Sequence, residues 1–191
     1  MKYILFILLT ALAACQPSIA TNTTDAPPPT AMAMTDSYEP TIPDTAWLHG
    51  DFNGDSIPDT AYSILLKARV DAETQDEYTI RFTTQDIPDL YAGEGDLRLI
   101  NEGDLNNDGR DDISIFRKPG NGCTYDMQPW SFTNGKWKAI SDMILVPTFC
   151  DYMSDSAVQA RIVNVDSTLF FYEPDYNIDI TKLVRKRLPL L

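Results

Sequence analysis

From residue 46 onward the chain is a succession of short runs in which hydrophobic and polar residues alternate or β-branched residues gather. Residues 77–83 alternate over the length of one strand, and the polar residues 70–77 before them are expected to form a connection. Within 130–140, Asn134-Gly135 separates two runs and favours the tight turn of a β-hairpin. The pattern predicts an all-β fold of antiparallel strands. Further runs of this kind lie at 60–66, 97–100, 113–116, 169–172 and 178–180.

Two features of this pattern allow both a structural and a functional interpretation. Trp130, Phe132 and Trp137 lie on the predicted hairpin. We expect them in the core or in cross-strand pairs, and a sugar-stacking platform is the alternative. A group of basic residues near the C-terminus is expected to be a solvated end, with a binding site as the alternative. These residues are Lys182, Arg185, Lys186 and Arg187.

The N-terminus has the features of a secretory signal. Lys2 precedes an apolar run, residues 3–14, which is too short to span a bilayer comfortably. The run ends in Leu12-Ala13-Ala14-Cys15, which resembles the lipobox of bacterial lipoproteins. The resemblance implies that residues 1–14 are a signal peptide and that Cys15 becomes the lipidated N-terminus, with acyl chains such as palmitate. An ordinary signal peptide followed by a chance cysteine is the alternative.

Residues 15–45 are predicted to be a flexible tether between the lipid anchor and a folded domain at 46–191. They are rich in Pro, Thr and Ala and carry no hydrophobic period, so they cannot bury a core. By resemblance to other lipoproteins, Gln16 after the cysteine favours the outer membrane over the inner one. No acidic run follows at 16–20, which favours the periplasmic face over the cell surface.

The charge balance limits the partners that the protein can have. The chain carries 28 acidic residues against 15 basic ones, a formal net charge of −13. This balance argues against nucleic acid and against adsorption to anionic lipid, so we expect the lipid anchor to provide the contact with the membrane. Cys123 and Cys150 remain after lipidation. In an oxidising compartment such an isolated pair favours a disulfide, and two buried thiols are the alternative.

The most specific motif is an acidic pattern that occurs twice, at 50–59 and at 103–112. With the first Asp as position 1, both copies place Asp, Asn, Asp and Asp at positions 1, 3, 5 and 9, which is the spacing of oxygen ligands in a calcium loop. With a backbone carbonyl at position 7, each copy predicts one Ca²⁺ site. The predicted ligands are Asp51, Asn53, Asp55, the Ile57 carbonyl and Asp59 in the first copy, and Asp104, Asn106, Asp108, the Arg110 carbonyl and Asp112 in the second.

Positions 6 and 12 distinguish these loops from each other and from an EF-hand. Position 6 needs a sharp turn, which Gly109 supplies in the second loop. Ser56 replaces it in the first, so we expect that site to be weaker or slightly distorted. An EF-hand has a bidentate Glu at position 12, but Tyr62 and Ile115 stand there, which excludes a complete EF-hand. Two Asp- and Asn-rich turns without an ion are the alternative.

An acidic loop of this kind between strands resembles the FG-GAP and VCBS repeats, the calcium-bearing blades of integrin-α-like β-propellers. The resemblance covers residues 50–66 and 103–117. Asp51 and Asp104 lie 53 residues apart, which suits one four-stranded blade. A closed propeller has about four to eight blades, and this chain has room for two or three. The resemblance therefore implies antiparallel blade-like sheets, either two or three propeller-type blades or a compact sandwich, with calcium loops between strands.

These patterns favour a non-catalytic, calcium-stabilised envelope lipoprotein that binds a protein or a glycan. One alternative is a subunit that completes a larger β-assembly through an exposed sheet edge. A carboxylate-dependent hydrolase is the weaker alternative, because the sequence has neither a Ser-His-Asp pattern nor an HExxH zinc motif. The single histidine is His49. We therefore expect no enzymatic activity.

Overall fold

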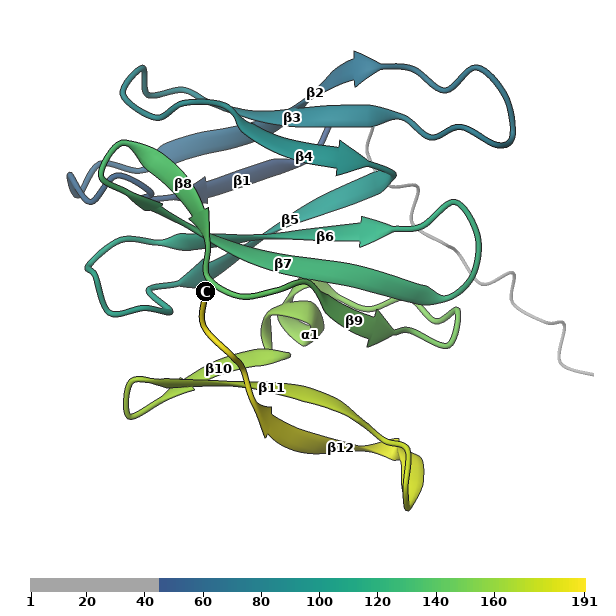
Figure 1. Cartoon of the computed structure of the whole chain (residues 1–191). Coiled ribbons are helices and arrows are strands. Elements are labelled where there is room, and N and C mark those ends of the chain that lie inside the picture. Colours follow the sequence, from purple (N-terminus) through teal and green to yellow (C-terminus); the bar gives the residue numbers. More distant parts are fainter. Residues whose placement is uncertain (1–44) are drawn as a thin grey trace, which may run out of the picture. The chain divides into compact units, whose positions relative to one another are not determined.

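Three antiparallel sheets make up the part of the chain that the structure, a computed structural model, describes, namely residues 45–191 (Figure 1). Within these residues no sheet closes on itself. The prediction of an all-β fold with antiparallel sheets is confirmed. The predicted signal peptide, the lipidated Cys15 and nearly all of the tether lie outside the described residues. In the described part of the chain, no helix has the length and the apolar character needed to cross a membrane.

The first sheet, which we call the N-terminal sheet, is a meander whose four strands lie side by side in chain order. The polar segment between its second and third strands is the connection that the sequence predicts. A bulge interrupts each of the last two strand pairs. The strands are β1 (Trp47–Gly50), β2 (Asp59–Lys67), β3 (Glu77–Phe82) and β4 (Leu90–Glu94).

The central sheet repeats this meander and adds a fifth strand, β9, beside β7. Its second strand, β6, is buried on both faces from Asp112 to Phe116, because packed layers cover both sides of the sheet. The polar residues Asp112 and Ser114 are therefore buried together with the apolar residues of this strand. The strands are β5 (Asp96–Gly103), β6 (Asp112–Lys118), β7 (Thr124–Thr133), β8 (Lys136–Ala139) and β9 (Ile144–Pro147).

The C-terminal sheet has three strands and follows a short helix, α1. The side chain of Ser154 caps this helix by accepting the N–H of Ala157. The sequence patterns did not predict α1, β4, β9 or β10 as separate elements. The elements of this region are α1 (Asp155–Gln159), β10 (Ile162–Val165), β11 (Thr168–Asp175) and β12 (Asp179–Arg187).

All four residues of the basic C-terminal group are exposed, as expected of solvated side chains, but they belong to a strand, β12, and not to a tail. Arg185 stacks on Phe170 of β11, with its guanidinium carbon 4.5 Å from the ring centroid. Lys186 forms an ion pair with Glu173, which also lies in β11. The sequence pattern extends this strand only over 178–180, because the basic residues hide its continuation.

The hairpin predicted at Asn134-Gly135 is confirmed. Both residues have positive φ, 54° and 72°, as the tight turn between β7 and β8 requires. The β10–β11 turn uses the same geometry at Asp166 and Ser167, with φ of 50° and 60°. Local turn chemistry therefore fixes two of the strand registers.

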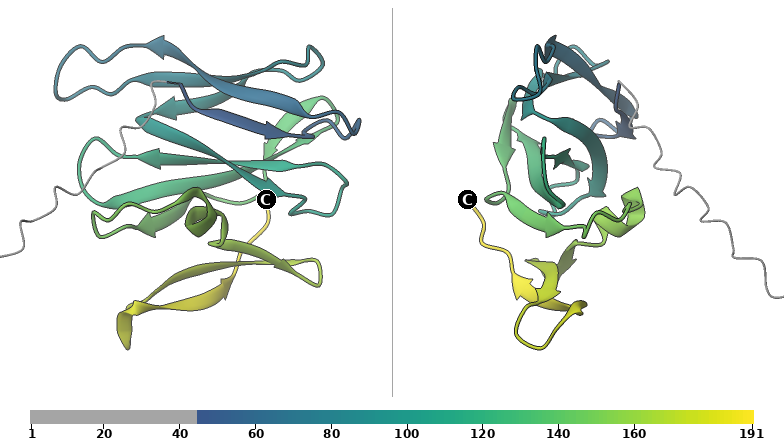
Figure 2. Two further views of the ribbon diagram at one scale, coloured as in Figure 1. Left: turned by 180° about the vertical axis from the view of Figure 1, so that it is seen from behind. Right: turned by 90° about the vertical axis from the view of Figure 1, so that its right-hand side faces the viewer.

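Two hydrophobic cores lie on the two faces of the central sheet. Figure 2 shows the N-terminal sheet and the C-terminal sheet on either side of it. The first core lies between the N-terminal and central sheets, where the ring of Trp137 stacks on that of Phe82 at 5.0 Å between centroids. Phe132 is buried there and Trp130 packs against it, which confirms the core interpretation of the hairpin aromatics. The second core joins the central sheet to α1 and the C-terminal sheet. It comprises Ile100, Leu105, Phe116, Met127, Ile140, Ile144, Val146, Val158, Ile162, Leu169 and Leu188.

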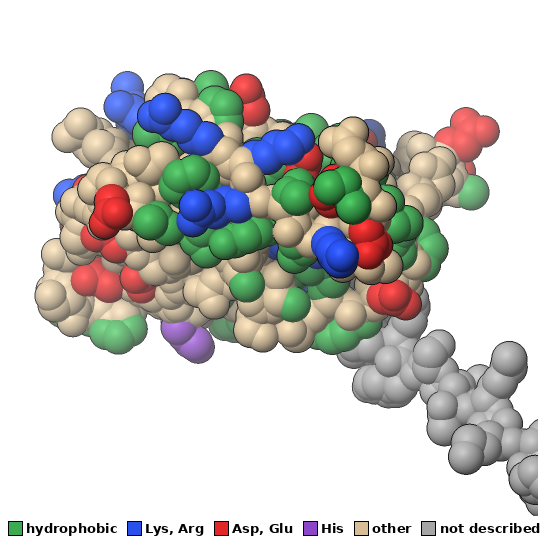
Figure 3. Space-filling model, turned by 90° about the horizontal axis from the view of Figure 1, so that it is seen from below, with side chains coloured by type: hydrophobic (Ala, Val, Ile, Leu, Met, Phe, Trp, Pro, Cys, Tyr) green, Lys and Arg blue, Asp and Glu red, His purple; other side chains and the backbone are tan. Residues whose placement is uncertain are grey.

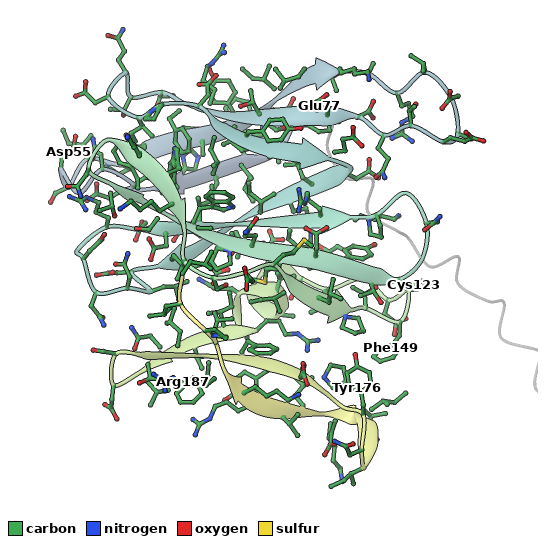
Figure 4. All side chains as sticks on the ribbon, viewed as in Figure 1. Asp55, Glu77, Cys123, Phe149, Tyr176 and Arg187 are labelled. Carbon is green, nitrogen blue, oxygen red and sulfur yellow. A yellow bond between two sulfur atoms is a disulfide. The ribbon has the colours of Figure 1, made fainter. Side chains whose placement is uncertain are left out.

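Cys123 and Cys150 form the predicted disulfide, with their Cα atoms 4.8 Å apart (Figure 4). It links the residue before β7 to the segment after β9. Beside it, the N–H and hydroxyl of Thr148 both donate to the Cys123 carbonyl, at 2.7 and 3.0 Å. On the chain-entropy view, a loop of this size stabilises the fold by about 3–4 kcal/mol.

Candidate metal centre

The two predicted calcium loops occupy the same place in two successive sheets. One loop joins β1 to β2 and the other joins β5 to β6, so each connects the first two strands of a meander. The last residue pair before each loop is equivalent in the two sheets, since Gly50 pairs with Asp59 and Gly103 pairs with Asp112. Figure 4 shows Asp55 at the tip of the first loop. The duplicated motif therefore corresponds to a duplicated structural position.

In the first loop the Asp51 side chain organises the turn. Its Oδ1 accepts the N–H groups of Gly54 and Asp55 at 2.8 and 3.0 Å, and its Oδ2 accepts that of Ser56 at 2.9 Å. Asn53 Oδ1 also accepts the N–H of Asp55, at 3.0 Å. The Asn53 Nδ2 group donates to Asp55 Oδ2 at 2.9 Å, which draws the side chains of positions 3 and 5 together.

The second loop repeats these bonds between the same positions. Asp104 Oδ1 accepts the N–H of Asp108 at 2.9 Å, and Asp104 Oδ2 accepts that of Gly109 at 2.8 Å. Asn106 Oδ1 accepts the N–H of Asp108 at 2.9 Å, and Asn106 Nδ2 donates to Asp108 Oδ2 at 3.2 Å. Two segments of different sequence thus form one loop architecture.

Both loops pass through left-handed backbone at positions 4 and 6. The φ angles are 78° at Gly54 and 60° at Asn107, then 65° at Ser56 and 84° at Gly109. The N–H of Ser56 makes the same bond to position 1 as that of Gly109, so the expected distortion is absent from this hydrogen bond. Strain of about 1 kcal/mol at a non-glycine residue remains as a reason to expect the weaker site there.

Position 9 differs between the loops. Asp59 is 1% exposed, and both of its oxygens have partners, the N–H of Phe52 and the hydroxyl of Thr84. Asp112 is 0% exposed, and its Oδ2 accepts the N–H of Leu105 at 2.9 Å. Its Oδ1 has no hydrogen-bond partner in the described residues. The second loop therefore has a buried carboxylate oxygen available to a cation.

Burial raises the pKa of Asp112 to about 7, although the nearby Ser131 hydroxyl and the hydrogen bond from the Leu105 N–H act in the opposite direction. Burial also raises the pKa of Glu102, to about 8. The adjacent Ser114 hydroxyl lowers that pKa, and the charge of Asp112 raises it further. Both shifts have one physical cause, since a buried carboxyl without a compensating cation favours its neutral form.

The donors of both loops fit calcium, because carboxylate, amide and main-chain oxygens are the ligands that Ca²⁺ prefers. The unpartnered Asp112 Oδ1 adds a specific argument for the second loop, where a buried polar atom needs a partner. Elsewhere in the loops, carboxylate oxygens accept hydrogen bonds from backbone N–H groups or from neighbouring side chains. Among residues 45–191, no three or more His, Cys, Asp or Glu side chains are already grouped as a metal site. The presence of an ion therefore stays a prediction.

The two loops are hydrogen-bonded to each other. The N–H of Asp51 donates to Asp111 Oδ2, and the N–H of Asp111 donates to the Asp51 carbonyl, both at 2.9 Å. Arg110 Nε donates to the Asn53 carbonyl at 3.1 Å. Asn101 Nδ2 supports the junction by donating to Asp111 Oδ2 at 3.1 Å. A change in one loop can thus reach the other.

Position 2 anchors each loop in a different core. Phe52 is 0% exposed in the first core, and Leu105 is 4% exposed in the second. Because the cores lie on opposite faces of the central sheet, each loop ties its own meander to the next layer. This arrangement explains how two short loops contribute to the packing of all three sheets.

A hollow of about 300 Å³ lies between the edge strand β4 and the central sheet. Aromatic rings and polar groups line it, among them Tyr91, Trp130, Trp137, Arg117 and Gln128. Arg117 is held in place by Asp126, at 2.6 Å from Nε, and by the Ala92 carbonyl. The hollow thus combines aromatic side chains with an amide group and a guanidinium group.

Sequence reasoning missed several residues of the loop region. Thr84, Asn101 and Asp111 support the loops from outside the ligand pattern, and Glu102 precedes the second loop as a buried acid. Only the fold brings these residues to the loops, so the motif gives no signal for them. Searches against protein-family models, curated proteins and solved structures find no match to this chain. The candidate site is therefore defined by its own residues and geometry.

Proposed function

We propose that the protein is a non-catalytic lipoprotein of the bacterial cell envelope, in which two calcium ions stabilise a β domain that binds a glycan. The observation that carries the calcium part is the hydrogen-bond network that both loops repeat, together with the unpartnered oxygen of Asp112. Calcium would tie the first two strands of each meander together. It would also offset part of the repulsion among the six aspartates at ligand positions.

Two features support the proposed location, the lipobox-like sequence near the N-terminus and the disulfide of the β domain. The lipobox-like sequence at Cys15 would anchor the mature protein, by preference at the periplasmic face of the outer membrane. The disulfide between Cys123 and Cys150 supports an oxidising compartment. The tether would hold the β domain away from the membrane surface, which suits a binding module.

Calcium titration of the chelator-treated protein by calorimetry, with melting curves alongside, tests the calcium part. We expect two sites with Kd of about 10⁻⁴–10⁻³ M, and a higher Tm with calcium. Asp108→Ala and Asp55→Ala should each remove one site. Asp86→Ala, at an exposed aspartate outside both loops, is the matched control and should bind as the wild type does. Absence of binding in the wild type would make the loops ordinary turns.

The hollow favours a glycan over a protein as the ligand. Its volume suits part of a small molecule, and it combines aromatic surfaces with amide and guanidinium groups that can bind hydroxyls. Tyr91 is 58% exposed at its edge, so its ring is available for stacking. The net charge of −13 disfavours polyanions, so we propose a neutral oligosaccharide.

Titration with neutral oligosaccharides, followed by tryptophan fluorescence, tests this assignment. Binding should weaken at least tenfold in Tyr91→Ala. Tyr176→Ala is the control, because Tyr176 is 60% exposed and does not line the hollow. Equal loss in both variants, or no binding to any oligosaccharide, would count against the glycan proposal and leave the calcium proposal intact.

A second candidate, a subunit of a larger β-assembly, is supported by the outer face of the C-terminal sheet. Leu169 lies in the second core, so by strand alternation Phe170 and the paired Arg187 face away from it. Hydrophobic and basic side chains mix on this face (Figure 3). Leu183 is 49% exposed there, and neither Arg185 nor Arg187 has an ion-pair partner among the described residues. The occupant would be a protein surface that carries carboxylates.

Cross-linking of the protein in intact envelopes tests this second candidate. Leu183→Asp should abolish a specific cross-linked species, whereas Val70→Asp should preserve it. Val70 is 78% exposed and lies in the β2–β3 connection, so it controls for the added charge. A chain that remains uncross-linked in envelopes would rule this candidate out.

A further inference from the structure

Four buried polar atoms without hydrogen-bond partners gather behind the second loop. In the described residues five buried side-chain atoms have no such partner. One is the indole nitrogen of Trp130, and the other four belong to three neighbouring residues. They are Glu102 Oε1, Glu102 Oε2, Asp112 Oδ1 and Ser114 Oγ.

These groups face one another across β5 and β6. Ser114 pairs with Ile100, and Glu102 lies at the register shift two residues further along β5. The carboxyl of Glu102 lies beside the Ser114 hydroxyl and within electrostatic range of Asp112. Glu102 is 9% exposed, and Asp112 and Ser114 are both 0% exposed. The cluster is therefore almost completely shielded from water.

Such a cluster is unfavourable unless something compensates it. Two buried carboxylates that keep oxygens without partners each lose several kcal/mol of hydration, and their mutual repulsion adds to this loss. Folded proteins satisfy nearly all buried polar groups, so several orphaned atoms in one place indicate a missing partner. No Lys or Arg side chain is recorded as a partner of Glu102 or Asp112 in the described chain.

The first repeat shows that its architecture does not require this acidic pair. The residues at the positions of Glu102 and Ser114 are the exposed His49 and the fully buried Ala61. The acid at position 9, Asp59, has partners for both oxygens. The first loop nevertheless forms the same turn, so the buried pair of the second repeat has a separate role.

We propose that Glu102, Asp112 and Ser114 hold a divalent cation of their own behind the second loop. This ion is a third one, in addition to the two loop ions of the proposed function. Its binding does not require the ion of the first loop. Two carboxylates and a hydroxyl are hard oxygen donors, which select Ca²⁺ or Mg²⁺ over softer metals. A double positive charge balances both carboxylates. Asp112 would connect this ion to the one in the second loop.

The burial of the site predicts that its ion leaves slowly. A cation held by residues 0–9% exposed can escape only when the strands open locally. The loops, in contrast, lie at an exposed edge where Asp55 and Asp108 reach solvent, so their ions exchange rapidly. Retention of metal after fast removal of free calcium therefore distinguishes the buried site from the loop sites.

The test measures metal content of the full mature chain after equilibration with calcium chloride and rapid desalting into metal-free buffer. We expect about one calcium ion per chain to remain in the wild type and in Asp55→Asn. Glu102→Gln and Ser114→Ala should each reduce the retained calcium at least tenfold. Glu94→Gln, at an exposed glutamate of β4, is the matched control. Circular dichroism checks that every variant is folded.

The outcomes separate this inference from the proposed function. Unchanged retention in folded Glu102→Gln and Ser114→Ala, or no retained calcium in the wild type, would overturn the buried site and leave the two loop sites standing. Retained calcium that depends on Glu102, without rapidly exchanging sites, would support the buried ion and refute the loop ions. Repeating the experiment with magnesium chloride decides which divalent cation the site prefers.

Discussion

Replacing Asp112 by Asn separates the cost of burying this carboxylate from its contribution to calcium binding. In Asp112→Asn the amide oxygen can keep the bond to the Leu105 N–H, and the amide nitrogen takes the place of the oxygen without a partner. The matched variant Asp59→Asn changes the same loop position, but there both oxygens already have partners. Without calcium, the two substitutions should therefore have opposite effects on stability.

The expected magnitudes follow from the burial of the two carboxylates. The pKa of Asp112 rises from 3.8 to about 7, and one unit corresponds to about 1.4 kcal/mol. This sets an upper bound of about 4 kcal/mol, which relaxation and water entry reduce. In chelator we expect Asp112→Asn to raise the free energy of unfolding by about 1–2 kcal/mol. Asp59→Asn should lower it by about 1 kcal/mol, because a neutral amide makes weaker hydrogen bonds than a carboxylate.

Calcium should reverse the ranking of the wild type and Asp112→Asn. At about 100 times Kd, each occupied site stabilises the folded state by about 2.7 kcal/mol. Asp112→Asn should lose the contribution of the second loop and become less stable than the wild type. Urea unfolding followed by tryptophan fluorescence, in chelator and in excess calcium, measures both changes.

The pH dependence gives an independent check on the calcium-free protein. A pKa raised from 3.8 to about 7 stabilises the folded state below the unfolded value, and this contribution is lost as the pH rises through 7. Glu102, with a pKa of about 8, acts in the same direction. The chelated wild type should therefore lose stability between about pH 4 and pH 8, and Asp112→Asn should lose less.

Two results would refute this reasoning. If Asp112→Asn is less stable than the wild type in chelator, its second oxygen has a partner in solution and the argument from burial is wrong. If the calcium-dependent gain is the same in both proteins, Asp112 is not a ligand. Equal effects of Asp59→Asn and Asp112→Asn in chelator would remove the distinction between the two loops.

Three further substitutions or treatments test the loops and the disulfide. Ser56→Gly should stabilise the protein by about 1 kcal/mol in urea unfolding, because it relieves a φ of 65°, and an unchanged midpoint would contradict the strain. Gly50→Ala should destabilise it by about 1–3 kcal/mol, since an added Cβ would lie 2.8 Å from Asn101 Nδ2, and wild-type melting would argue against this close packing. Reduction of Cys123–Cys150 should lower the free energy of unfolding by about 3 kcal/mol, whereas free thiols in envelope-purified protein would show that the bond does not form in the cell.

Local patterns in the sequence predicted several features that the structure confirms. The Asn134-Gly135 turn, the strand at 77–83 and the strands around both acidic loops depend on residues close in the chain, where backbone preferences act directly. The pairing of Cys123 with Cys150 needed no geometry, because only two cysteines remain beyond Cys15. The loop motif likewise gave the positions of the turn, since the side chains at positions 1, 3 and 5 bond to their own backbone.

Other features were hidden because their local signal is weak or misleading. The basic residues of β12 are exposed, as the sequence predicts, but only the pairing with β11 shows that they belong to a strand. Short elements such as β4 and α1 have too few residues to show a period. Their structure is stabilised by tertiary packing, in which Leu90 and Val158 fill the two cores.

By itself the sequence determined the strand-forming character of the chain, its turns, its disulfide and the duplicated loops, because each depends on spacing along the backbone. Only the tertiary structure decided which carboxylates are satisfied. Folding places the Thr84 hydroxyl in hydrogen-bond contact with Asp59, and it places Glu102 within electrostatic range of Asp112. The two copies of one motif therefore acquire different environments. The reason is that burial and hydrogen bonding depend on neighbours distant in the chain, whereas loop spacing is local.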